Sequence, residues 1–434
     1  GLQGVSAPEI LVSADKVQTW AVEEMVQLVE APEEGDITKE LDNGKINLYT
    51  RQTDDHGVWY LPAPLSVDTV DNEYTQIGTL NRMATIQYGP DGTSETFDFG
   101  DGRGWKGSVS GGSIELTLAN DWDLVNRFSY TEGDADTYGL VPNGDPTLLS
   151  AVADSGDSAF GAVTGTEYAG STMVQQIGRW VVQKQIEAFT NDFALTKTLE
   201  RGSYTLGYYS STYSAKDWWA LGNQAYQVVE SGGEMLTGID CNDTQDSCGW
   251  NYDINSNGDG STKAFYAAAS VDVTNSFTLD GGIRSEQHKI EYVVDEGLDG
   301  KITKSVSYDE SEIAWTVGAN WMFAEDMGMF ARINEGSKMP YFDDFRDNYG
   351  AYSEGEDLIK EVSQFELGYK LAKDNYNLYA TFFINEVKGD TFVAQPGDPA
   401  EILTNEAYGV EVDFNYFNDN GFSVNLNSTI QETE

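Results

Sequence analysis

Cysteine, histidine and basic residues are scarce in this 434-residue sequence, which has two Cys and two His. Structural zinc sites take their ligands from these two residue types, and both are so scarce that we expect no such site. Lys and Arg number 25 against 72 Asp and Glu, a formal net charge of −47. This charge argues against a nucleic-acid partner, because nucleic acids are polyanions.

Long apolar runs are also absent. No stretch approaches the roughly 18 apolar residues that a membrane-spanning helix needs. Residues 1–4 have neither a basic region nor an apolar core, so we expect no signal peptide. A β-barrel stays open as a membrane protein, because its strands need only about 9–11 residues each and have weak hydropathy.

Alternation of apolar and polar residues is the dominant pattern that is present. It is clearest in 313–321, 376–385, 408–416 and 422–430, and it is typical of half-buried antiparallel strands. By this period we count about fourteen strands, and Lys45–Arg51 is the earliest clear one.

Short and long connections alternate between these strands. The short ones are turns of Asn, Asp, Gly or Ser, at 119–121, 200–202, 274–276, 323–326, 372–375 and 418–421. The long ones are polar segments at 132–175, 211–263, 286–311, 336–361 and 388–405. Outer-membrane barrels have one short rim and one elaborated rim. We therefore predict an all-β fold, a transmembrane antiparallel up-and-down β-barrel with short periplasmic turns and long extracellular loops.

The polar face of the predicted strands carries charges that a packed core rarely holds. They are Arg127, Asp280, Arg332, Glu366, Lys370, Glu411 and Asp413. We expect this face to line a wet or plugged lumen.

Two features of the longest predicted loop have specific interpretations. The run 216–222 reads as a short helix. Asp253, Asn255, Asn257 and Asp259 match the first half of a calcium-binding loop, D-x-[DN]-x-[DN]-G, although Ala264 stands where the pattern has its bidentate Glu. The alternative is an ordinary loop tip. Apart from this calcium ion, we expect no cofactor.

Cys241 and Cys248 lie in the same loop. We predict a structural disulfide, because the periplasm and the cell surface are oxidising. Two free thiols or a pair of metal ligands are the alternatives.

Aromatic and charged residues of the long loops are candidate ligand contacts. They are Trp218, Trp219, Trp250, Tyr252, Arg332, Tyr341, Asp343, Asp344 and Arg346. Such aromatic rings stack on sugars or planar ligands. Alternatively they pack the loops together or belong to the aromatic girdle of a barrel.

Catalytic motifs are missing. The sequence has no G-x-S-x-G and no H-E-x-x-H. The single G-x-G-x-x-G at 102–107 lies outside any strand–helix unit, so we interpret it as a turn. We expect no enzyme.

Three segments in order resemble the middle barrel of TonB-dependent outer-membrane receptors: Val362–Lys370, Tyr376–Val387 and Thr404–Val412. Phe330–Pro340 is similar to the family's entry to an outer loop. Further segments resemble a proteobacterial branch of the family, namely Arg51–Pro62, Asn191–Lys197 and Tyr213–Asn223. The resemblance covers roughly residues 40–430.

The family has a plug domain followed by a barrel of roughly 22 strands. We recognise no plug, no TonB box and no terminal aromatic strand in this sequence. We therefore expect an unassigned segment at 1–36 and an incomplete barrel at 37–434.

The resemblance implies an outer-membrane protein of a Gram-negative bacterium that takes up a scarce nutrient. Its expected partners are the TonB–ExbB–ExbD energy-coupling complex, acting through a plug, together with lipopolysaccharide and the nutrient ligand. Loop aromatics and the −47 charge favour an oligosaccharide over an anionic ferric siderophore. A passive channel or surface-binding barrel is the alternative, and a secreted β-rich binding protein is the third hypothesis.

Overall fold

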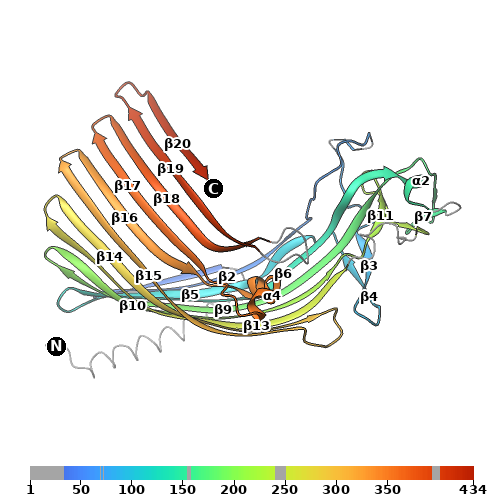
Figure 1. Cartoon of the computed structure of the whole chain (residues 1–434), viewed down its shortest axis with the longest axis horizontal. Coiled ribbons are helices and arrows are strands. Elements are labelled where there is room, and N and C mark those ends of the chain that lie inside the picture. The colour runs from blue at the N-terminus through green and yellow to red at the C-terminus, as the bar shows by residue number, and fades with distance from the viewer. Residues whose placement is uncertain (1–33, 69, 72, 154–157, 240–250, 393–400) are drawn as a thin grey trace.

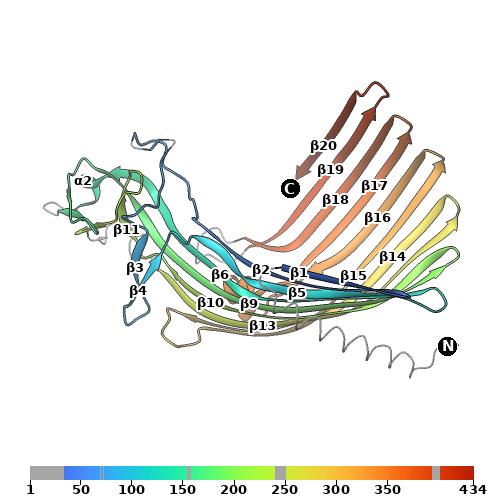
Figure 2. The same ribbon diagram turned by 180° about the vertical axis from the view of Figure 1, so that it is seen from behind.

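The computed structural model describes residues 34–68, 70–71, 73–153, 158–239, 251–392 and 401–434. Its main element is a large antiparallel sheet that curves into an open trough (Figures 1 and 2). Fourteen strands pair in sequence order: β1 (Glu34–Leu41), β2 (Gly44–Gly57), β5 (Arg103–Leu118), β6 (Trp122–Leu148), β9 (Met173–Leu199), β10 (Gly202–Leu221), β13 (Tyr252–Thr274), β14 (Phe277–Glu296), β15 (Lys304–Ala324), β16 (Met327–Lys338), β17 (Lys360–Lys373), β18 (Tyr376–Phe392), β19 (Glu401–Phe417) and β20 (Ser423–Thr433).

This order is that of an up-and-down barrel wall, which confirms the predicted fold class. All six predicted short turns join neighbouring strands at one rim of the sheet. The wall is not closed, because β1 and β20 are the two ends of the sheet in the described part of the chain.

The long connections differ from the prediction, because much of each is strand. β6 continues to Leu148 and β9 begins at Met173, so each has 27 residues, whereas about 9–11 suffice to cross a membrane. The short helix expected at 216–222 is also wrong, since residues up to Leu221 belong to β10. The strands therefore extend beyond the part that spans the bilayer.

One face of the sheet, which we call the outer face, carries an exposed apolar band. Residues paired across the strands share a face, and the register aligns Leu367, Phe382, Val410 and Ile430 in one row. All four side chains are more than a third exposed. Such a band fits the hydrocarbon layer of a membrane. Among the described residues, no helix is both long and apolar enough to cross a membrane.

The opposite, inner face carries the charges that the sequence predicts for the lumen. Arg332 Nη2 lies 2.6 Å from Asp280 Oδ2, and Arg332 Nη1 donates to Thr316 Oγ1 at 2.9 Å. Glu366 is the cross-strand neighbour of Arg332. Paired charges of this kind are accommodated in a wet lumen, whereas an apolar core rarely holds them.

Beyond the apolar band, each face of the extended strands is covered in part. The hairpin of β3 (Met83–Tyr88) and β4 (Thr93–Asp98) packs on the outer face, where Ile86, Phe97 and Val181 are buried. The inner face is covered by α3 (Phe342–Asp347) and α4 (Tyr349–Ser353) (Figure 1). The extension therefore has a small hydrophobic core of its own, outside the bilayer.

A third cluster surrounds the buried carboxylate of Glu234 near α2 (Leu149–Val152), β7 (Ala159–Gly161), β8 (Glu167–Tyr168), β11 (Ala225–Val228) and β12 (Leu236–Thr237). Glu234 accepts hydrogen bonds from the backbone of Val163 at 3.1 Å and Thr164 at 3.0 Å, and from Tyr168 Oη at 2.9 Å. Burial alone would raise the pKa of Glu234, but these bonds outweigh it and hold the pKa below its usual value.

Candidate functional site

Residues 339–359, which we call the docked segment, lie between β16 and β17 and pack on the inner face of the extension. Phe345 of α3 is fully buried. Its ring centre lies 5.1 Å from that of Tyr308 on β15 and 5.1 Å from that of Tyr352 on α4. Aromatic and aliphatic contacts of this kind dominate the packing of the segment.

Gly258 on β13 permits the close approach of the docked segment. A Cβ atom at this position would lie 2.5 Å from Phe342 Cε1, well inside van der Waals contact. Phe342 instead stacks on Tyr292, the cross-strand neighbour of Gly258, with ring centres 5.3 Å apart and planes at 25°. The glycine is therefore needed for docking.

His288 links the barrel wall to the start of the docked segment. Its Nε2 lies 3.1 Å from Pro340 O and its Nδ1 lies 2.9 Å from Thr262 Oγ1. The carbonyl can only accept, so the tautomer with a proton on Nε2 fits both contacts. Burial lowers the pKa of His288, opposed by the Pro340 carbonyl and by Glu286. The neutral ring is thus the form that suits the docked state.

Trp219 on β10 contacts two cationic side chains, one from the docked segment and one from the barrel wall. The Arg346 guanidinium carbon is 4.4 Å from its ring centre, and Lys184 Nζ is 5.4 Å from it. Lys184 Nζ also lies 3.4 Å from Asp217 Oδ2. Two cations therefore contact one indole ring, an arrangement that cation–π attraction favours.

Asp217 is almost completely buried, with 4% of its side chain exposed. Burial raises its pKa, and Lys184 offsets part of this rise. On the same face, burial also raises the pKa of Tyr292 to about 12. We call Asp217, Trp219, Tyr252, Ser256 and Tyr292 the Trp219 site. It can hold a positively charged group by its aromatic faces and its carboxylate.

The structure brings four of the predicted contact residues together here: Trp219, Tyr252, Asp343 and Arg346. Tyr341 lies at the start of the docked segment, against His288. Asp344 has a different role, because its Oδ2 accepts from the backbone N–H of Tyr341 at 2.8 Å and caps α3. Tyr341 is 55% exposed, whereas the other two aromatic side chains are partly covered. Trp219 and Tyr252 pack between the barrel wall and the docked segment, and ligand contact stays a prediction for both.

The other predicted contacts lie elsewhere. Trp218 points to the outer face and packs on Tyr88 and Phe97 of the covering hairpin, with ring centres 4.8 and 6.1 Å away. Arg332 pairs with Asp280, about 40 Å from the Trp219 site along β14 at about 3.3 Å per residue. Trp250, Cys241 and Cys248 lie outside the described residues, so the disulfide stays a prediction.

The predicted calcium loop is a strand. Asp253, Asn255, Asn257 and Asp259 are alternate residues of β13 on its outer face. Side chains two residues apart along a strand are separated by about 6.6 Å, so the four do not surround one centre. Among the described residues, no group of three or more His, Cys, Asp or Glu side chains could hold a metal ion. Calcium binding stays a prediction, without a loop to support it.

Sequence reasoning missed Asp217, Ser256 and Tyr292 as members of this site, and Lys184 beside it. One signal was present, since Ile290, Tyr292 and Val294 alternate on one face. That pattern indicates an apolar inner face in a segment that we assigned to a polar loop.

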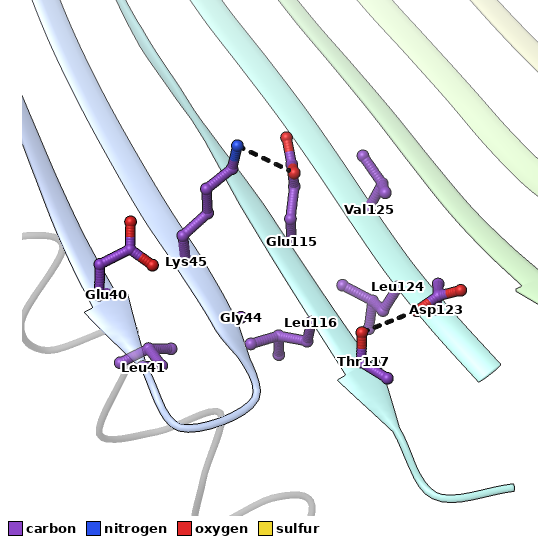
Figure 3. A pocket seen from close by; sticks show the side chains of 10 residues that line it. All are labelled: Glu40, Leu41, Gly44, Lys45, Glu115, Leu116, Thr117, Asp123, Leu124 and Val125. Carbon is purple, nitrogen blue, oxygen red and sulfur yellow. Dashed lines mark hydrogen bonds and ion pairs between the residues drawn. The ribbon is translucent and has the colours of Figure 1, made fainter. Parts of the chain in front are cut away.

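Two hollows elsewhere on the sheet are weaker candidates. One, of about 460 Å³, lies by the short turns of β2, β5 and β6, where Lys45 Nζ pairs with Glu115 Oε2 at 3.3 Å (Figure 3). The other, of about 330 Å³, includes Arg127, Asp192 and Tyr209 on the inner wall. Both are far from the long-strand rim, so the docked segment marks the stronger site.

Comparison with known families agrees with this architecture. Residues 38–432 match the family model described as TonB dependent receptor-like, beta-barrel. This chain belongs to the TonB-dependent receptor family. The barrels of TonB-dependent receptors lie in the outer membrane of Gram-negative bacteria, and this receptor barrel is therefore an outer-membrane protein.

Solved receptors share its fold at low sequence identity. The ferripyoverdine receptor of Pseudomonas aeruginosa is 14% identical with a TM-score of 0.53, over 92% of this chain and 48% of that one. The ferric preacinetobactin receptor BauA of Acinetobacter baumannii is 12% identical with a TM-score of 0.52, over 92% and 54%. This receptor barrel thus spans about half the length of these neighbours. No match was found among curated proteins.

Proposed function

We propose that this barrel wall belongs to a receptor that takes up a scarce nutrient across the outer membrane. The observation that carries the proposal is the separation of the two faces. The outer face exposes an apolar band, whereas the inner face holds charge pairs such as Arg332 with Asp280. A wall with a polar interior suits passage of a polar solute rather than a dry core.

Energy coupling follows from the family. TonB-dependent receptors obtain the energy for uptake from the inner membrane. We therefore propose the TonB–ExbB–ExbD complex as the partner of the whole protein, with lipopolysaccharide around the barrel. The ligand would bind at the extracellular rim, where the docked segment covers the inner face.

The packing of the loop aromatics weakens the preference for an oligosaccharide as the ligand. Loop aromatics and the net charge of −47 favour an oligosaccharide, but Trp218 and Trp219 pack against other side chains. Two of the solved neighbours are named for ferric siderophores, yet at such low identity they share only the fold. We therefore place ferric siderophores beside oligosaccharides as the two ligand classes to test.

Uptake by cells provides the test. The full-length receptor gene is deleted and restored, and uptake of radiolabelled ferric siderophores and oligosaccharides is measured with and without TonB. We expect one ligand class to accumulate only when both the receptor and TonB are present. Uptake that needs the receptor but continues without TonB would instead establish a passive channel.

A further inference from the structure

Arg346 is buried in an unusual way for a charged side chain at a protein surface. Only 6% of it is exposed, and its guanidinium lies over Trp219 at 4.4 Å. Its ion pairs are with Asp343 and Asp347 of its own segment, at 2.8 and 2.9 Å. Both carboxylates are more than half exposed. Arg346 therefore brings its counterions with it, and the wall supplies an aromatic surface.

The wall beneath Arg346 has unused hydrogen-bonding capacity. Among the described residues, two buried atoms of the Trp219 site lack a hydrogen-bond partner: Asp217 Oδ1 and Trp219 Nε1. Asp217 and Ser256 are direct cross-strand neighbours. Buried polar groups are normally satisfied, so this surface can bind a group with more polar contacts than Arg346 makes.

We propose that the Trp219 site binds a positively charged group of the transported ligand, a guanidinium or an ammonium, and that Arg346 occupies the site in its place until the ligand displaces it. This inference rests on the proposed function and names the ligand chemistry at that rim. The ring of Trp219 attracts either cation, and the free oxygen of Asp217 accepts a hydrogen bond from the ligand that it does not receive from Arg346.

The charges around the Trp219 site support a competition between Arg346 and the cationic group of the ligand. Lys184 neutralises one oxygen of Asp217 but leaves Oδ1 free. When the docked segment leaves, Asp343 and Asp347 leave with Arg346, so the wall keeps its own charge balance. A net charge of −47 also favours cationic over anionic ligands near this protein.

The test compares two probes on the full-length receptor in detergent micelles. One is Nα-acetyl-arginine methyl ester. The other is Nα-acetyl-citrulline methyl ester, which has the same shape but an uncharged side chain. Binding is measured by equilibrium dialysis. Because a site that is mostly occupied shows an affinity reduced by the free fraction, Arg346→Gln should tighten binding of the arginine probe by about ten- to a hundredfold.

Three further variants separate the explanations. Gly258→Val should displace Phe342 without removing any member of the Trp219 site, and it should also tighten binding of the arginine probe. Trp219→Leu should abolish the gain in either background. Lys289→Gln is the matched control, because it removes a cation from the outer face of β14; it should change nothing.

The inference is overturned if neither Arg346→Gln nor Gly258→Val tightens binding of the arginine probe relative to Lys289→Gln. Equal binding of the citrulline probe overturns it as well. Either result would leave the proposed function standing, because TonB-dependent uptake can persist when the probe does not bind. Conversely, tight probe binding without any TonB-dependent uptake would refute the transport proposal alone.

Discussion

Replacing Phe345 by Ala tests whether the apolar cluster holds the docked segment. Phe345 is fully buried between Tyr308 and Tyr352, and truncation of such a side chain costs about 3–5 kcal/mol. At about 1.4 kcal/mol per factor of ten, the docking equilibrium should fall by about two to four orders of magnitude. The strands keep their own backbone hydrogen bonds, so the loss should be confined to the segment.

Hydrogen exchange measured by mass spectrometry gives the assay. The amides to follow are those of Phe345, Asn348 and Tyr352, which donate to carbonyls within the segment. Their protection should fall by the factor given above, whereas peptides from β14 and β15 should be unchanged. Phe382→Ala, on the exposed outer face, is the control and should leave the segment protected. Unchanged protection in Phe345→Ala would refute the reasoning.

Three more predictions concern pH, a buried carboxylate and the bilayer. Burial lowers the pKa of His288 below 6.5 in the docked state, so the stability that the neutral ring contributes is present above pH 6.5 and is lost as the pH falls. Protease cleavage at 339–359 should therefore increase when the pH is lowered from about 7.5 to about 5. His288→Phe should remove this pH dependence. Glu234→Gln presents an NH₂ group to donors and should cost about 1–3 kcal/mol, seen as faster exchange at Thr164; the wild-type contribution should fade in acid as pH falls from the usual value near 4.5 through the lowered pKa. Ile283→Arg, in the apolar band, should cost about 2–4 kcal/mol in urea unfolding from lipid vesicles. Gln287→Arg, on the same face but beside Lys263 and beyond the band, should cost far less; equal losses would show that the band is not in contact with lipid.

The membrane part of the fold was predictable from sequence because its physics is local. A strand with lipid on one face and water on the other has a strict period of two. The turns at 200–202 and 418–421 carry residues that favour tight turns, and both join neighbouring strands as expected.

The extension was not predictable in the same way, because parts of both its faces are covered. Trp218 packs under the β3–β4 hairpin and Trp219 under the docked segment, so consecutive residues are apolar and the run 216–222 imitates a helix. The reverse error occurs at Asp253–Asp259, where Asn255, Asn257 and Asp259 alternate because they are exposed on the outer face of a strand. Their spacing imitates a calcium motif.

The candidate site was only partly predictable. The sequence names Trp219 and Arg346 among its candidate ligand contacts, and the structure places these two side chains against each other. Their contact joins β10 to a helix far along the chain, and no local pattern specifies such a pairing. Gly258 shows the limit well, since a glycine assigned to a calcium loop makes room for Phe342.

Labelling of single cysteines in intact cells tests the central claim, that this sheet crosses the outer membrane with its extended strands outside. In a full-length receptor with Cys241 and Cys248 replaced by Ser, cysteine is placed at Asn257 on the extension, at Ile283 in the apolar band or at Asn375 in a short turn. A membrane-impermeant maleimide should label position 257 in intact cells, position 375 only after the outer membrane is permeabilised, and position 283 in neither case. Labelling of position 375 but not 257 in intact cells, or of all three, would contradict the account.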